Sequence, residues 1–205
     1  MIIIGITGSI GMGKTTVSKM LRILKIPVFD SDKTVKEILD KNYDIIEKIS
    51  EIWPESVMFH QKQKKINKEV LSNKIFESKN ERKKLEKIIH PLVKKERTSF
   101  LKKYRKYFVV GLDIPLLYET KMDKVCDHIF LVNTTKKIQR KRVLNRDKIS
   151  NSLFEKIIKS QLSFEEKIKF KPQIINTKRA KFFIFLKVII ILTKIQIGLI
   201  LNNGK

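Results

Sequence analysis

The residues with the clearest chemical meaning lie near the start of the chain, where positions 8–15 read GSIGMGKT. This segment fits the phosphate-binding loop pattern G-x-x-x-x-G-K-[ST]. Glycines let backbone N–H groups converge on phosphate oxygens, and the N-terminus of a following helix favours anions. We expect Lys14 to reach the β- and γ-phosphates and the Thr15 hydroxyl to help hold Mg²⁺. The expected nucleotide-binding residues of this loop are Gly8, Gly11, Met12, Gly13, Lys14, Thr15 and Thr16.

The segments around this loop have the order that its mechanism requires. Residues 1–6 form a short, β-branched stretch that is typical of a buried strand. After the loop, apolar residues recur at helical spacing between positions 17 and 24, and Pro27 follows shortly afterwards. A strand, a glycine loop and a helix are the context that distinguishes a phosphate-binding loop from an ordinary glycine-rich turn.

Aspartates follow two of the expected strands. Asp30 and Asp32 come after a short strand at 28–29, and Asp113 ends a strand over 107–113. Catalytic groups of open α/β sheets lie at the carboxyl ends of strands. We therefore expect Asp32 to be a base or orienting group for a phosphate-accepting hydroxyl, and Asp113 to bind magnesium. The alternative is a cap on the following helix, which stays open for Asp30, whereas catalysis is favoured for Asp32.

A second group of candidate residues is basic. Arg140, Arg142 and Arg146 lie on a helix expected over 136–146, and the last two share a face because they are four residues apart. Arginines suit the charge that spreads over a transferring phosphoryl group. We interpret this helix as part of a lid that closes over the nucleotide, and a solvated basic face is the alternative.

Strands and helices alternate along the chain, which favours a parallel sheet covered by helices on both faces. Further strands are expected at 127–132 and 174–176. Between 33 and 107 the apolar residues have helical spacing, with turn-like breaks at 53–54 and 90–91. Because a crossover of this length is more than one helix, we expect it to form a separate helical lobe.

The chain is strongly basic, with 45 lysines and arginines against 21 acidic residues and a net charge of +24. Its lysines are spread along the whole length, and the sequence has no zinc-finger spacing, RNA-recognition motif or basic zipper. We therefore expect no specific nucleic-acid partner, and a field that steers polyanionic small substrates. The single cysteine, Cys126, excludes an intramolecular disulfide framework. The start of the sequence has no secretory signal features, which predicts a cytoplasmic protein.

The loop, the aspartates and the arginines belong to motifs that resemble those of the dephospho-coenzyme A kinase family. Besides the loop, the resemblance rests on FDSD at 29–32, LEKIIHPLV at 85–93, DIPLLYE at 113–119, QRKRVLNRD at 139–147 and QLSFEEK at 161–167. These motifs occur in the family's order and cover the chain to about Asn176. Many families share the loop, but the HP and PLL segments are more specific.

The resemblance implies an α/β fold of the P-loop NTPase superfamily, similar to nucleoside monophosphate kinases, with a parallel sheet flanked by helices. It implies a kinase domain over residues 1–177, whose core comprises 1–32 and 108–134. Residues 33–107 would form a helical lobe that binds coenzyme A, and residues from about 135 to 155 a small lid.

The resemblance also implies an activity, the transfer of the γ-phosphate of ATP to the ribose 3′-hydroxyl of dephospho-CoA, with Mg²⁺. This reaction is the last step of coenzyme A synthesis. It assigns Asp32 to the base near that hydroxyl. Lys14 and Arg142 would act at the transferring phosphate, and Arg142 and Arg146 would contact ATP.

Other residues are assigned to substrate and metal. The expected metal-binding residues are Thr15 and Asp113. The expected substrate-binding residues are Asp32, His90, Pro115 and Leu116. We interpret His90 as architecture of the substrate lobe rather than as a chemical group. The expected partners are ATP and dephospho-CoA, and the expected state is a monomer or weak oligomer.

The C-terminal segment, residues 178–205, departs from the family's pattern. Instead of an Asn-x-Gly turn and a helix with a polar face, residues 182–201 are nearly all apolar. Lys187 and Lys194 argue against a membrane span, since a lysine costs about 2.5–3.5 kcal/mol near the bilayer centre. A buried terminal helix or strand, or a change of reading frame, are alternatives. We favour a soluble tail that is poorly matched to its fold, with no membrane partner.

Two other function classes stay open. The first is another small P-loop kinase, acting on a nucleotide, a nucleoside or a shikimate-like alcohol, and the second is a basic NTPase that binds nucleic acid. The first class carries different acceptor motifs after its second strand. Binding to nucleic acid at physiological salt would support the second.

Overall fold

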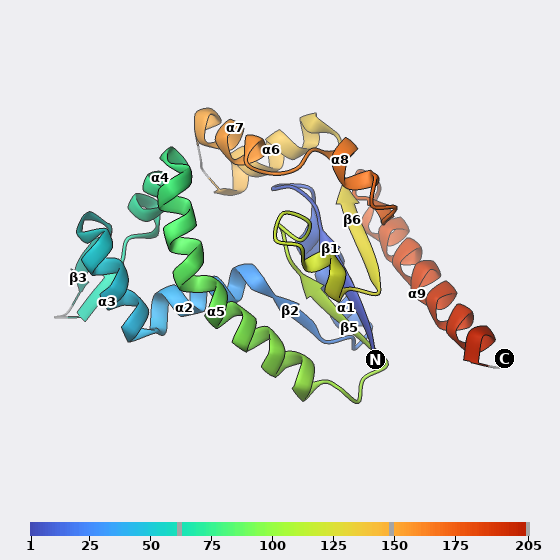
Figure 1. Cartoon of the computed structure of the whole chain (residues 1–205). Helices are drawn as coiled ribbons and strands as arrows, with labels where there is room; N and C mark the ends of the chain where they lie inside the picture. Colours follow the sequence, from blue (N-terminus) through green and yellow to red (C-terminus); the bar gives the residue numbers. More distant parts are fainter. Residues whose placement is uncertain (61–62, 148–149, 204–205) are drawn as a thin grey trace. The chain divides into compact units, whose positions relative to one another are not determined.

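The computed structural model describes residues 1–60, 63–147 and 150–203, except for the side chains of residues 60, 76, 77, 146, 147 and 199–203. The chain divides into two compact units (Figure 1). The first unit comprises Met1–Phe29 and Tyr104–Lys205, and the second comprises Asp30–Lys103. Each unit has its own hydrophobic core.

The described residues form a five-stranded sheet with strand order β2-β5-β1-β6-β7. These strands are β1 (Ile2–Thr7), β2 (Val28–Asp30), β5 (Val109–Asp113), β6 (His128–Asn133) and β7 (Gln173–Asn176). Strand β1 pairs in parallel with β5 and β6, and β6 pairs in parallel with β7. The parallel sheet is therefore confirmed, and the carboxyl ends of its strands share one edge.

Helices of the first unit follow the strands in alternation. They are α1 (Lys14–Ile23), η2 (Met122–Val125), α6 (Lys136–Asp147), α7 (Asn151–Lys159), α8 (Phe164–Ile168) and α9 (Lys181–Asn203). Figure 1 shows α6, α7 and α8 crossing the end of the sheet toward which β6 points. The core of the unit lies between the sheet and two helices that contact one another, α1 and α9.

The apolar C-terminal segment forms the long helix α9 and takes part in this core. Ile184, Val188, Ile191 and Ile195 are buried in the same cluster as Val17 of α1. These positions repeat every three or four residues, so they share one face of the helix. The expectation of a tail poorly matched to its fold is therefore wrong for this face, because it supplies buried side chains to the core.

The second unit is mainly helical. It contains α2 (Ser31–Lys41), α3 (Tyr43–Ile52), η1 (Pro54–Ser56), β3 (Val57–His60), β4 (Gln63–Ile66), α4 (Lys68–Glu77) and α5 (Lys79–Lys103). Trp53 is 1% exposed at the centre of its core, and the indole N–H donates to Glu81 Oε2 at 2.6 Å. This hydrogen bond satisfies the one polar group that burial of the ring would otherwise strand.

Two details of this unit differ from the sequence prediction. First, β3 and β4 form an antiparallel hairpin within the stretch expected to be helical. The hairpin's apolar residues are grouped at 57–59 and at Ile66 and do not alternate with polar ones, so its sequence carries only a weak strand pattern. Second, α5 continues through Pro91, where a break was predicted. Leu85 and Ile89, before the proline, are buried in the core of this unit, and Leu92 and Val93, after it, pack against that core, so contacts hold the helix on both sides of Pro91.

Candidate active site

The loop between β1 and α1 adopts a conformation that requires its glycines. Gly8, Gly11 and Gly13 have φ values of 147°, 74° and 99°, a region that side chains disfavour. Space is also limiting, because a Cβ at Gly8 would lie 2.4 Å from the carbonyl oxygen of Val132. A Cβ at Gly11 would lie 2.5 Å from a methyl group of Val143. The loop is therefore packed against β6 and α6, and its path is fixed.

Side chains from α6 and from the end of β7 hold the carbonyl groups of this loop. Gln139, which is 5% exposed, donates from Nε2 to the carbonyl of Ile10 at 2.8 Å. The Thr177 hydroxyl donates to the carbonyl of Met12 at 2.7 Å. Arg142 in turn donates to the hydroxyl and the carbonyl of Thr177, at 2.9 and 3.0 Å. Gln139 and Thr177 are supports that sequence reasoning did not single out as site residues.

The first turn of α1 carries the two side chains expected to act on phosphate and metal. Lys14 is partly exposed, and its Nζ donates to the carbonyl of Gly8 at 2.9 Å, so it lies over its own loop. Thr15 is exposed at the start of the helix. Residues 14–17 include no acidic side chain, so the positive end of the helix dipole stays uncompensated by its own sequence. This arrangement suits a bound phosphate anion.

Asp113 ends β5 directly beside the end of β1, because it pairs in register with Ile6. It is 6% exposed, and its Oδ2 accepts a hydrogen bond of 2.6 Å from the hydroxyl of Ser18 on α1. The Thr7 hydroxyl donates to the carbonyl of Pro115 at 3.0 Å, which fixes the segment after Asp113. The Asp113 carboxylate and the hydroxyl groups near it are hard oxygen donors, which are the ligands that Mg²⁺ prefers.

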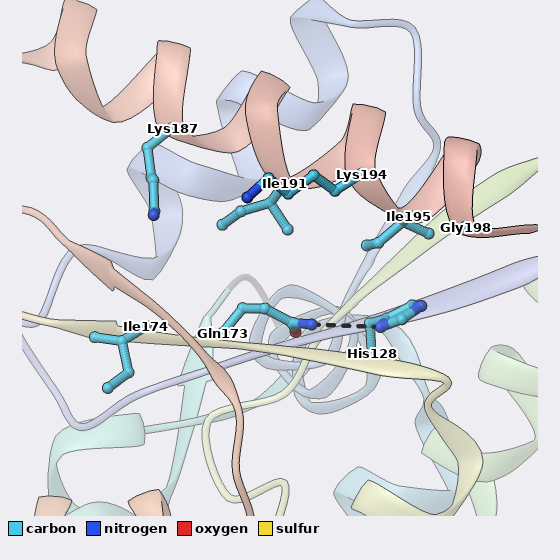
Figure 2. Close-up of a pocket in the computed structure, with 8 residues that line it drawn as sticks. All are labelled: His128, Gln173, Ile174, Lys187, Ile191, Lys194, Ile195 and Gly198. Carbon is cyan, nitrogen blue, oxygen red and sulfur yellow. Dashed lines mark hydrogen bonds between the residues drawn. The ribbon is translucent and has the colours of Figure 1, made fainter.

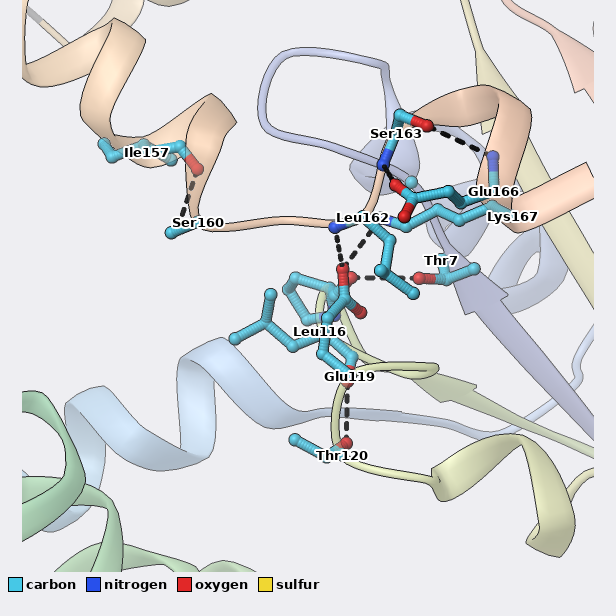
Figure 3. Close-up of polar contacts among 12 residues, drawn as sticks. Thr7, Leu116, Glu119, Thr120, Ile157, Ser160, Leu162, Ser163, Glu166 and Lys167 are labelled. Atoms are coloured by element: carbon cyan, nitrogen blue, oxygen red, sulfur yellow. Dashed lines mark hydrogen bonds and ion pairs between the residues drawn. The ribbon is translucent and has the colours of Figure 1, made fainter. Parts of the chain in front are cut away.

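The segment after β5 is anchored by an ion pair between a buried lysine and a half-buried glutamate, shown in Figure 3. Lys167 of α8 is 1% exposed, and its Nζ lies 3.2 Å from Oε1 of Glu119. The same oxygen accepts a hydrogen bond of 2.8 Å from the backbone N–H of Leu162. Tyr118 precedes Glu119 in this segment. Burial raises its pKa to about 12, and the negative charge of Asp123 is the second cause of this shift. Pro115 and Leu116 are thus held on a segment tied to α8.

The two candidate aspartates at the end of β2 and just after it belong to the second unit and have different local roles. Asp30 is the N-cap of α2, and its Oδ1 accepts a hydrogen bond of 3.0 Å from the N–H of Lys33. Asp32 is exposed in the first turn of the same helix. Because Asp30 occupies the cap position, capping does not explain Asp32. His90 also lies in this unit, exposed on α5.

The arginines of α6 point to different partners. Arg142 reaches Thr177 at the loop, whereas Arg140 donates to Asn151 Oδ1 at 2.9 Å and lies 3.8 Å from Glu155 on α7. The side chain of Arg146 lies outside the described residues. Val143 is fully buried, so this part of α6 is fixed to the core and the basic helix is more than a solvated face.

The described residues contain no helix long and apolar enough to cross a lipid bilayer. Within the same ranges, no group of three or more histidine, cysteine, aspartate or glutamate residues is placed to hold a metal ion.

Comparison with known proteins identifies relatives over nearly the whole chain. The family model for dephospho-CoA kinase matches residues 2–181. The dephospho-CoA kinase of Fusobacterium nucleatum is 41% identical over 167 residues, which cover 82% of this chain and 84% of the relative. That of Bacillus cereus strain ATCC 10987 is 33% identical over 204 residues, covering 98% and 96%.

A solved structure agrees with these matches. The dephospho-CoA kinase from Campylobacter jejuni superposes with a TM-score of 0.69 at 25% identity, covering 96% of this chain and 98% of that one. The match to the Bacillus cereus relative extends into the apolar C-terminal segment, since it covers 98% of the chain. Most of the segment after residue 178 is therefore included in a match to a known relative.

Proposed function

This chain belongs to the dephospho-CoA kinase family, and we propose how its residues divide the work of that family's reaction. The reaction is the ATP-dependent phosphorylation of dephospho-CoA, the final step of coenzyme A synthesis. The observation that carries the proposal is the ordered loop at residues 8–15, held by Gln139 and Thr177 and flanked by Asp113 and Arg142.

We propose that Asp32 is the base. Its carboxylate accepts the proton of the ribose 3′-hydroxyl as that oxygen bonds to the γ-phosphorus of ATP, and the bond to the leaving ADP breaks. Support comes from its position two residues after β2 and from Asp30, which already caps α2. The other candidates for the base are Asp113 and Glu119, and Glu119 forms an ion pair with Lys167.

Cationic groups at the loop balance the charge of the transferring phosphoryl group. Lys14 sits on the first turn of α1, and a short movement from the Gly8 carbonyl would bring its Nζ to a phosphate oxygen. Arg142 is already oriented by Thr177 beside the loop. Both charges act where negative charge spreads in the transition state, which is the most effective place for them. We propose Arg146 as a further ATP contact.

Magnesium fits the oxygen donors on this edge of the sheet. We propose that the Thr15 hydroxyl and the Asp113 carboxylate hold it together with phosphate oxygens of ATP, because Mg²⁺ is usually bound by one or two protein groups plus substrate. The ion supplies charge neutralisation on the phosphates when bound. Turnover should vanish in excess chelator and return with added Mg²⁺, and full activity in chelator would refute this assignment.

The two units suggest where the substrates bind. We propose that the second unit contributes the coenzyme A lobe, with His90 as part of its architecture, and that Pro115 and Leu116 contact dephospho-CoA. The segment from about 135 to 155 is proposed as the lid. Because Gln139, Arg142 and Val143 fasten α6 to the loop, lid movement would occur beyond Val143. We further propose a cytoplasmic enzyme that acts as a monomer or weak oligomer without a nucleic-acid partner.

The deciding experiment is a phosphate-transfer assay with purified protein. ATP is offered with dephospho-CoA, adenosine, AMP and shikimate in parallel, and the product is resolved by mass and by cleavage with a 3′-nucleotidase. We expect efficient transfer to dephospho-CoA alone and a product that carries a 3′-phosphate. A preference for a nucleoside or shikimate would favour the alternative of another small P-loop kinase, and ATPase activity stimulated by nucleic acid would favour the second alternative.

A further inference from the structure

The helix α9 carries an exposed apolar surface on the side that faces away from the core. Phe182, Phe183, Leu186, Ile190 and Ile197 are 64%, 55%, 39%, 50% and 50% exposed. Positions 182, 186, 190 and 197 recur at intervals of four and seven residues, so these side chains line one face of the helix. We call these five side chains the α9 stripe. The rings of Phe182 and Phe183 pack edge to face at a centroid distance of 5.7 Å.

The opposite face of α9 fixes the stripe in place. Ile184, Val188, Ile191 and Ile195 are between 0% and 8% exposed and belong to the core of the first unit. The helix therefore cannot turn the stripe inward without giving up these buried contacts. An exposed apolar helix face that is fixed in this way is a candidate interaction site.

The charges near the stripe all have one sign. Residues 178–205 contain lysines and one arginine but no aspartate or glutamate. Lys187 and Lys194 are seven residues apart and lie next to the stripe on the helix surface. Both line a pocket of about 540 Å³ between α9 and the first residues of β6 and β7, His128 and Gln173 (Figure 2). In Figure 2, Lys187 extends from α9 toward the sheet edge that carries Ile174.

We propose that the α9 stripe rests on the surface of an anionic lipid membrane, with α9 parallel to the surface. Such a surface offers what the helix lacks, an apolar boundary for the stripe and negative headgroups for Lys187 and Lys194. Long lysine side chains can keep their charge at the headgroups while their stems cover apolar surface. A second copy of the chain fits less well, because each copy carries a net charge of +24 and two copies repel.

This surface uses no residue of the proposed active site. The phosphate-binding loop follows the carboxyl end of β1, whereas the pocket beside Lys187 and Lys194 opens at the amino ends of β6 and β7. Binding to a membrane through α9 therefore leaves the loop residues unchanged. It would hold a cytoplasmic enzyme of this family at the membrane without a spanning segment.

The test is flotation of the full-length protein with vesicles of phosphatidylcholine alone and of phosphatidylcholine mixed with phosphatidylglycerol. We expect binding to the mixed vesicles at least roughly tenfold tighter than to the neutral ones, and weakening with salt. Phe182→Ser combined with Phe183→Ser should reduce binding by roughly tenfold or more, because both rings lose their lipid contact. Lys187→Gln combined with Lys194→Gln should remove most of the preference for the anionic vesicles.

A matched control separates the stripe from general exposure of aromatic rings. Tyr43 and Phe59 are 70% and 74% exposed in the second unit, and Tyr43→Ser combined with Phe59→Ser should leave vesicle binding unchanged. Circular dichroism and turnover of dephospho-CoA verify that each variant is folded. If the double phenylalanine variant fails this check, Ile190→Gln replaces it, with the same expected direction.

Three outcomes of the vesicle experiments would overturn the proposal. They are failure of the wild type to bind mixed vesicles, equal binding to neutral and mixed vesicles, and an equal loss in the control variant. A concentration-dependent dimer in sedimentation velocity that disappears in the phenylalanine variant would assign the stripe to a second copy instead, and would also overturn it.

Discussion

Replacing Asp32 by asparagine separates a chemical role of this residue from a structural one. Asp32 lies in the first turn of α2, and Asp30 is the N-cap that accepts the N–H of Lys33 at 3.0 Å. Asparagine keeps the shape of aspartate but removes its negative charge. The structural cost is therefore the loss of one favourable charge near a helix N-terminus, about 0.3–1 kcal/mol.

The expected chemical cost is much larger. A general base typically contributes about 10²–10⁴-fold to the rate. Since each tenfold step is about 1.4 kcal/mol, this factor corresponds to roughly 3–5 kcal/mol of transition-state stabilisation. Asp32→Asn should thus lower kcat by at least roughly a hundredfold, while the Kd for ATP and the melting temperature change little.

Asp30→Ala is the matched comparison, because it removes the neighbouring carboxylate and the cap together. Loss of an N-cap costs about 0.5–2 kcal/mol. In a chain of this size each kcal/mol lowers Tm by about 2–4 °C. We expect Asp30→Ala to lower Tm measurably and to reduce kcat less than Asp32→Asn does.

The assays are single-turnover and steady-state transfer to dephospho-CoA, nucleotide binding by calorimetry, and thermal unfolding, all on the same preparations. An Asp32→Asn enzyme with nearly normal kcat would refute the assignment of the base. The search would then move to Asp113 and, despite its ion pair, to Glu119.

Three further predictions follow from named contacts. Lys14→Ala should reduce kcat/KM by roughly a hundredfold or more without unfolding the protein, as measured by transfer rate and circular dichroism, because one cation at the phosphates is lost. Lys167→Met should destabilise the fold by at most about 3–5 kcal/mol in denaturant titration, because it leaves the half-buried Glu119 carboxylate without the charge of Lys167, and adding Glu119→Gln should recover much of the loss. Hydrogen bonds from the backbone and hydroxyl of Ser163 hold the pKa of Glu166 below its ordinary value of 4.5. The contribution of Glu166 to folding stability is therefore present above pH 4.5 and is lost as pH falls through the lowered pKa. The drop in Tm on acidification should be smaller in Glu166→Gln than in the wild type.

Residues close together in sequence account for the parts of the site that could be predicted. The loop at 8–15 is identified by fixed residue types at fixed spacing, since glycine conformation and the lysine and hydroxyl positions are local requirements. The parallel sheet followed from alternating strand and helix patterns, which is also a local signal. Family membership followed from motifs that occur in order along the chain.

The supports of the loop could not be predicted, because they connect residues distant in sequence. Thr177 donates to Met12, 165 positions away, and Gln139 donates to Ile10, 129 positions away. Their partners are backbone carbonyls, which have no residue-specific pattern. Strand pairing brings them together, and sequence spacing alone carries no information on that pairing.

The sequence alone determined the phosphate-binding loop, the basic charge, the parallel α/β plan and the family, since each depends on residue type, order or local period. Only the tertiary structure decided which of two aspartates caps α2, whether Arg140 or Arg142 reaches the loop, and which face of α9 is buried. The hairpin of β3 and β4 and the passage of α5 through Pro91 were decided there too. The physical reason is that burial and long-range hydrogen bonds outweigh local propensities, which are a fraction of a kcal/mol for most residues and about 3 kcal/mol for a proline inside a helix.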